Sequence, residues 1–155
     1  MKKEDVINTI RDILEEDDYR YDFNPEQDSI IFNLAMDNKL KSCRLVIGFA
    51  PHGFNIFAVS PISADDNCMD EMRKYLSMVN ATLINGGFDL HSDGDIAYRC
   101  WLSTGWLEKL PKEALFESLS IAFNFLRLYG DGIAAIAFGF SNAETEFKKA
   151  QEKRG

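Results

Sequence analysis

The longest helix that the sequence predicts carries apolar side chains on more than one face. It opens at Pro111, a residue well suited to a first helical turn, and extends to Tyr129. Its apolar residues are Ala114, Leu115, Phe116, Leu119, Ile121, Ala122, Phe123, Phe125, Leu126, Leu128 and Tyr129. A surface helix buries one stripe, and one stripe cannot contain all of these side chains. We therefore expect this helix either to lie at the centre of the fold or to offer apolar surface to a partner.

Before this helix, the apolar pattern switches between the periods of helices and strands. Helical spacing over residues 3–16 predicts an amphipathic first helix. Alternation of period two then predicts a four-strand antiparallel meander over residues 19–23, 29–36, 40–50 and 54–59. A second amphipathic helix follows, with N-cap candidates at residues 63–66 and apolar positions from Met69 to Leu83. Residues 88–90 and 96–102 flank an Asp-Gly turn and predict a β-hairpin.

The C-terminal part is expected to contain two further segments. Gly130-Asp131-Gly132 is predicted to interrupt the long helix before a short apolar segment at residues 133–138. Ser141 and Glu144 fit a capping box, which predicts a polar terminal helix over residues 144–153. Because no strand-helix-strand alternation of the parallel type occurs, the class is α+β with a segregated antiparallel sheet. Residues 1–155 are predicted to form a single domain, of which residues 141–155 are a polar helical tail.

The charge balance argues against several classes of partner. The 155 residues include 17 Lys plus Arg and 25 Asp plus Glu, a net charge of −8. Nucleic acids and anionic membranes both require clustered cations, so neither is an expected partner. No run of about 20 apolar residues is present, and the acidic amphipathic start does not resemble a signal peptide. Together with three widely spaced cysteines that match no metal motif, this predicts a cytoplasmic protein without a cofactor.

The sequence contains no motif typical of catalysis. His52 and His91 fall in predicted turns, and no nucleophile or phosphate-loop motif accompanies them. Asp89, Asp93 and Asp95 lie close together, but the terminal Glu of a calcium loop is missing. We therefore expect no enzymatic activity and no metal site.

Several short segments resemble the YbjN-type family of bacterial proteins. They are Asn80-Ala81-Thr82-Leu83, Gly87-Phe88-Asp89-Leu90, Asp93-Gly94-Asp95-Ile96-Ala97-Tyr98-Arg99, and Leu126-x-x-Tyr129 before an apolar stretch. That family is similar in fold to the class I type III secretion chaperones, and the predicted element order agrees with that fold from about residue 3 to 139. The resemblance implies a compact α+β domain that dimerises and acts by binding. Chaperones of that fold hold partly unfolded protein segments along apolar grooves.

Two functions remain open at this point. In the first, the chain is a protein-binding or chaperone-like module, a homodimer whose apolar patches receive a protein or peptide through Trp101, Trp106, Phe116, Phe123, Phe125 and Arg99. Arg99 is expected either to pair with an acid of its own sheet or to anchor a peptide carboxylate. In the second, a pocket between sheet and helices serves a small-ligand sensor or enzyme, with Arg99, His91 and Tyr98 as its polar groups.

Overall fold

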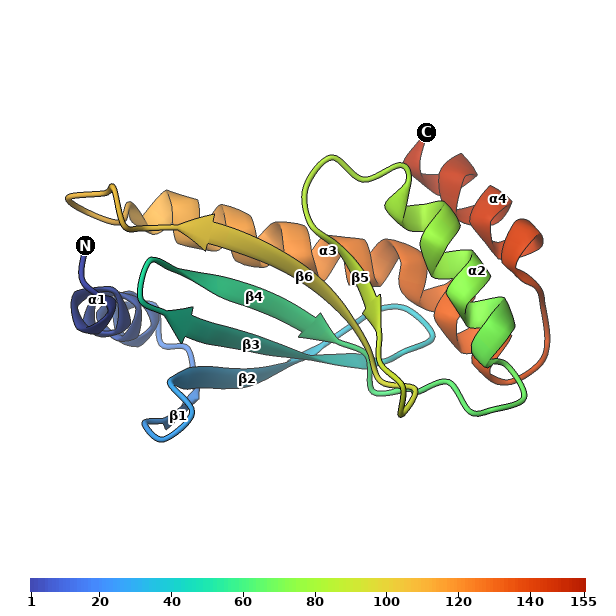
Figure 1. The fold of residues 1–155 in the computed structure, drawn as a ribbon, viewed down its shortest axis with the longest axis horizontal. Coiled ribbons are helices and arrows are strands. Elements are labelled where there is room, and N and C mark those ends of the chain that lie inside the picture. Colours follow the sequence, from blue (N-terminus) through green and yellow to red (C-terminus); the bar gives the residue numbers. More distant parts are fainter.

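The computed structural model describes all 155 residues as one six-stranded antiparallel sheet and four helices, which confirms the α+β class (Figure 1). The elements are α1 (Lys3–Glu16), β1 (Asp22–Asn24), β2 (Ser29–Ala35), β3 (Ser42–Ala50), β4 (Gly53–Val59), α2 (Met69–Asn80), β5 (Gly87–Leu90), β6 (Ile96–Ser103), α3 (Lys112–Ala137) and α4 (Ala143–Arg154). No helix is long and apolar enough to cross a membrane.

The strand order of the sheet is β1-β2-β3-β4-β6-β5. Strands β1 to β4 therefore form the predicted meander, and the β5–β6 hairpin extends the same sheet through β6. The register places Val46 opposite both Ile31 and Phe57, and Phe57 opposite Arg99. Because side chains alternate along each strand, these four residues project from one face of the sheet. We call this the outer face.

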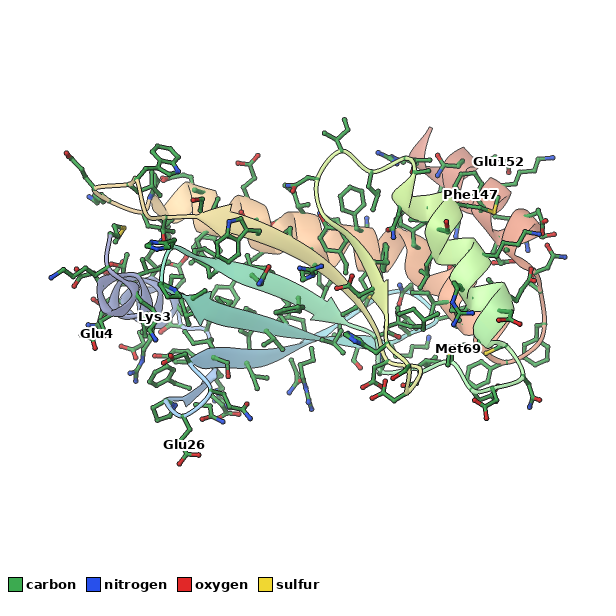
Figure 2. All side chains as sticks on the ribbon, viewed as in Figure 1. Lys3, Glu4, Glu26, Met69, Phe147 and Glu152 are labelled. Atoms are coloured by element: carbon green, nitrogen blue, oxygen red, sulfur yellow. The ribbon has the colours of Figure 1, made fainter.

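The helices cover only the other face, here called the inner face. Helix α3 lies along it, α1 lies at one end of the sheet, and α2 and α4 pack beside the C-terminal half of α3 (Figure 1). One core of 35 buried residues joins all four helices to the inner face. Figure 2 shows Lys3 and Glu4 at the α1 end of the molecule, while Phe147 and Glu152 lie on α4 at the opposite end.

The predicted break in the long helix is wrong, because α3 continues without interruption from Lys112 to Ala137. Two glycines inside a helix cost about 1 kcal/mol each relative to alanine. Here both lie where another side chain leaves no room: a Cβ at Gly130 would stand 2.6 Å from Leu40, and one at Gly132 would stand 2.3 Å from the Tyr75 hydroxyl. Close tertiary packing thus requires glycine at these positions and outweighs their low helix propensity.

Three element starts also differ from the prediction. The first strand begins at Asp22, because residues 19–21 contact α1 and α3 instead of pairing with β2. Helix α2 begins at Met69 with no side-chain cap, so residues 63–66 do not cap it. Helix α4 is capped by Asn142, whose side chain accepts a hydrogen bond from the Thr145 amide. The Ser141 hydroxyl donates to Glu146 instead, so the predicted capping box is not formed.

Candidate protein-binding groove

An apolar groove of about 220 Å³ lies between the N-terminal half of α3 and the inner face of β2 and β3. Seven of its nine lining residues are hydrophobic: Tyr19, Phe32, Leu34, Leu45, Phe116, Leu119 and Phe123, with Ser120 and Asn124 as the polar members. Of these residues, Phe32, Leu45 and Leu119 are buried in the core, whereas Leu34, Phe116 and Phe123 are only partly buried against it. These three side chains, together with Tyr19, therefore provide the accessible apolar surface of the groove.

Phe116 and Phe123 form the helical wall of this groove. They are seven positions apart, which is close to two helical turns, so both project from the same side of α3. Each is partly buried against the core. Phe125 projects from another side, where its ring lies 5.2 Å from Tyr98 and 6.4 Å from Tyr129. One apolar side of α3, with Phe116 and Phe123, thus lines the groove, whereas another side, with Phe125, packs against Tyr98 and Tyr129.

Tyr19 closes one side of the groove. Its ring centroid lies 6.0 Å from that of Phe32 and 5.7 Å from that of Phe116, so it bridges strand and helix. The backbone amide of Tyr19 donates a hydrogen bond to the carbonyl of Leu14 near the end of α1, which fixes the position of Tyr19 relative to that helix. With 39% of its surface exposed, Tyr19 remains accessible to a bound chain.

The groove adjoins a sheet edge that is partly free. Strand β1 pairs only with Ser29, Ile30 and Ile31 of β2, so residues 32–35 pair with β3 on one side and with no strand on the other. Within this free stretch, Phe32 and Leu34 face the groove, while the intervening Asn33 and Ala35 face outward. A free strand edge carries unpaired backbone amides and carbonyls that can accept a further strand. An extended chain placed here would meet both these groups and the groove.

The charges near the groove are mainly acidic. Asp17 pairs with Lys112 at 2.6 Å, which raises the pKa of that lysine, while Glu16, Asp18 and Glu117 form no ion pair. Arg20, which follows Tyr19, forms no ion pair, and Arg11 contacts the rings of Tyr21 and Phe23 instead of a carboxylate. Beyond the far end of β2, Asp37 pairs with Arg127 at 3.2 Å. A ligand in the groove therefore meets a negative field that favours basic flanking residues.

The structure distributes the other predicted site residues over separate surfaces. Trp101 and Arg99 project from the outer face, and Arg99 pairs with Asp89 at 2.8 Å, the acid-pairing alternative. Trp106 lies in the β6–α3 loop and is 77% exposed. Only Phe116 and Phe123 line the groove, so sequence reasoning missed Tyr19, Phe32 and Leu34. The period-two pattern contains the last two, but nothing in it indicates which strand lacks a neighbour.

The three polar residues of the small-ligand alternative do not converge. Tyr98 faces the core, where its hydroxyl donates to the Asn85 carbonyl at 2.6 Å and burial raises its pKa. Arg99 projects from the opposite face, and His91 is exposed in the β5–β6 turn. No group of three or more His, Cys, Asp and Glu side chains is arranged to hold a metal ion. The three free cysteines are buried, and burial raises the pKa of Cys43 to about 11.

The sequence matches no protein-family model, no curated protein and no solved structure.

Proposed function

We propose that the chain is a non-enzymatic, chaperone-like module that holds an extended apolar segment of another protein in the α3–β2 groove. The observation that carries this proposal is the junction of the groove with the free edge of β2 at residues 32–35. The main chain of the segment would pair with this edge and add a strand to the sheet. Its alternate side chains would then point into the groove between Phe32 and Phe123.

The groove and its surroundings define the chemistry of the partner segment. Alternation along a strand sends every second side chain inward, so the segment needs apolar residues at alternate positions. The unpaired acids Glu16, Asp18 and Glu117 favour lysine or arginine at its ends. Each apolar side chain fully buried in such a groove contributes about 2 kcal/mol, so two of them contribute about 4 kcal/mol, which alone corresponds to a Kd of about 1 mM; strand pairing adds to this.

The remaining expectations are consistent with this function. A binder of extended segments needs no catalytic group, metal or cofactor, and in the cytoplasm, where we expect the protein to act, its net charge of −8 would attract basic segments. The proposed function is also the one that membership of the YbjN-type family, with its chaperone-like fold, would imply. The small-ligand alternative has less support because its three polar residues lie on different surfaces.

Synthetic peptides test the proposal. The probe is a short fluorescent peptide in which leucine alternates with threonine between terminal lysines, and binding is followed by fluorescence anisotropy. We expect saturable binding that weakens when glutamates replace the lysines. A central proline should abolish it, because proline cannot donate to the strand edge and disfavours continued pairing.

A groove variant and a matched control make the test specific. Ser120→Trp places an indole in the groove from an exposed position, and we expect it to raise the peptide Kd at least about tenfold, a loss of about 1.4 kcal/mol. Ser77→Trp makes the same change at an exposed site on α2 and should leave the Kd unchanged. Equal binding by the Ser120→Trp variant and the wild type would overturn the proposal. So would a lack of binding up to about 1 mM peptide.

A further inference from the structure

A polar recess of about 410 Å³ lies on the outer face of the sheet, where β5 ends beside β6. Its volume falls within the roughly 300–1,000 Å³ of small-molecule sites. The residues that line it come from three parts of the chain: Asn55 on β4, Asn80 and residues 85–89 around the start of β5, and residues 99–101 on β6. No helix covers this face of the sheet (Figure 1), and the α3–β2 groove lies on the other face. The recess is therefore a separate candidate site.

Trp101 is the one large apolar side chain that the recess exposes. Phe88 and Cys100 also line it, but both side chains are buried and face the core. The indole of Trp101 lies against the backbone of β4, because a Cβ at Gly53 would overlap its six-membered ring. The residue is nevertheless 48% exposed. An aromatic ring that is supported by a strand and open to solvent offers a surface on which the flat apolar side of a ligand can stack.

Several polar groups around this ring have no partner within the chain. The side-chain amides of Asn55 and Asn85 form no hydrogen bond, and neither does the indole N–H of Trp101. Arg99 donates to Asp89 through its Nε atom at 2.8 Å, which leaves its two terminal nitrogens free. A side-chain amide both donates and accepts, whereas a guanidinium group only donates. A ligand that carries several hydroxyl groups can pair with all of them, because each hydroxyl is both a donor and an acceptor.

The edge of β6 adds backbone groups to the recess. Strand β5 begins at Gly87, opposite Arg99, so no strand pairs with β6 beyond Arg99 on this side. The carbonyl of Arg99 points towards this side, because a Cβ at Gly86 would overlap it. Backbone groups alternate in direction along a strand, so the amide and carbonyl of Trp101 point the same way. They lie beside the indole and remain available to a ligand.

The loop that closes the recess is held in place from below. The Tyr98 hydroxyl donates to the carbonyl of Asn85 at 2.6 Å. Gly86 then takes a φ of +66°, which glycine adopts at little steric cost, and this lets the loop approach β6 closely. The side chain of Asn80 accepts from the Phe88 amide at 2.7 Å and donates to its carbonyl at 3.0 Å. The wall is thus ordered before a ligand arrives, which lowers the entropic cost of binding.

The charges of the recess favour an uncharged ligand. Asp89 and Arg99 are its only charged residues, and they pair with each other. An anionic ligand would have to compete with Asp89 for the guanidinium group, and a cationic one would have to compete with Arg99 for the carboxylate.

We propose that this recess binds a neutral pyranose sugar. A pyranose combines the two features that the recess requires, because its ring has a flat side of C–H groups and a rim of hydroxyl groups. The C–H side stacks on the indole of Trp101, and the hydroxyl groups bond to the amides of Asn55 and Asn85 and to the Asp89–Arg99 pair. A nucleobase would also stack, but it has no hydroxyl groups for these partners. The inference goes beyond the proposed peptide binding and does not depend on it.

Tryptophan fluorescence of the full chain tests this site. The chain has two tryptophans, so Trp106→Phe leaves Trp101 as the sole reporter. Trp106 is 77% exposed, and its replacement therefore carries little risk to folding. The probes are glucose, galactose, mannose and N-acetylglucosamine. We expect at least one of them to change the Trp101 emission saturably, with a Kd of about 1–10 mM.

A recess variant and a matched control make this test specific. Asn55→Leu keeps the size of the side chain next to Trp101 but removes its hydrogen-bonding groups, and we expect it to raise the Kd at least about tenfold. Asn33→Leu makes the same change at an outward position of β2, away from the recess, and should leave the Kd unchanged. Trp101→Leu should abolish binding, which is followed by NMR of the sugar signals because this variant lacks the reporter.

Three results would overturn the inference. The first is the absence of a saturable response to any of the four sugars up to about 100 mM. The second is equal binding by Asn55→Leu and Asn33→Leu. The third is a response to adenine in the absence of any response to the sugars, which would assign the recess to nucleobases. Because peptide binding is measured separately with Ser120→Trp on the other face of the sheet, each proposal can fail without the other.

Discussion

The hydroxyl group of Tyr75 donates a hydrogen bond of 2.9 Å to the backbone carbonyl of Tyr129, inside α3. This contact brings α2 against the middle of the long helix. It is possible only because residue 132 is glycine, since a Cβ there would stand 2.3 Å from the same hydroxyl oxygen. The burial of Tyr75 also raises the pKa of this hydroxyl, so it stays protonated as a donor.

Gly132→Ala should therefore destabilise the protein although alanine is the better helix former. We expect the free energy of unfolding to fall by about 1–3 kcal/mol, the usual cost of overpacking a core. Urea denaturation measures this loss. In a Tyr75→Phe background the closest atom is gone, so the added cost of Gly132→Ala should be smaller. Equal costs in the two backgrounds would contradict the assigned contact.

Periodicity in the sequence predicted the helices and strands in their correct order, because each element has its own pattern of apolar residues. It failed at Gly130 and Gly132, where the reason for glycine is a side chain distant in the sequence. The groove was predictable only in part, because its strand side also depends on contacts between residues distant in the sequence. The spacing of Phe116 and Phe123 indicates a shared helical side, whereas the free edge at residues 32–35 depends on where β1 stops pairing.

Asn38 connects the β2–β3 loop to α3 through side-chain hydrogen bonds. Its side-chain amide donates to the carbonyls of Leu126 and Arg127 at 3.3 and 2.9 Å, and its side-chain oxygen accepts from the Leu40 amide at 3.0 Å. Asn38→Ala leaves the Leu40 amide without its partner in a buried site. We expect a loss of about 2–3 kcal/mol in the free energy of unfolding.

The control for Asn38→Ala is Asn33→Ala, which removes an exposed amide from the neighbouring strand. Its effect should stay within about 0.5 kcal/mol. Thermal or urea denaturation of the two variants side by side gives the comparison. Similar losses from both variants would mean that the hydrogen bonds of Asn38 are not the cause.

Asp131 makes stability depend on acid pH. Burial alone would raise the pKa of its carboxyl group, but hydrogen bonds from the Lys39 amide at 2.8 Å and the Lys153 ammonium at 3.2 Å lower it overall. A lowered pKa in the folded state means that the carboxylate stabilises the fold above the ordinary aspartate range. This contribution disappears as the pH falls through the lowered folded-state pKa.

Asp131→Asn should thus be less stable than the wild type at pH 7, by about 0.5–1 kcal/mol. The difference should shrink below about pH 4, where the wild-type carboxylate becomes protonated. Urea denaturation at several pH values follows this change. Asp12→Asn removes an exposed carboxylate that forms no ion pair or hydrogen bond and controls for the loss of one negative charge. A difference that persists unchanged at low pH would contradict the role of ionised Asp131.

Ser29 begins β2 with a buried hydroxyl group that has no hydrogen-bond partner. Burying such a group costs about 1–3 kcal/mol, so Ser29→Ala should raise the free energy of unfolding, by up to about 1–2 kcal/mol. Ser60→Ala is the matched control, because the equally buried Ser60 hydroxyl donates to the Ile62 carbonyl at 2.8 Å and accepts from its amide at 3.1 Å. Its removal should lower stability by about 1 kcal/mol. Calorimetric unfolding of both variants measures whether the free energy of unfolding rises or falls in each. If Ser29→Ala lowers it as much as Ser60→Ala does, the Ser29 hydroxyl has a hydrogen-bond partner in solution.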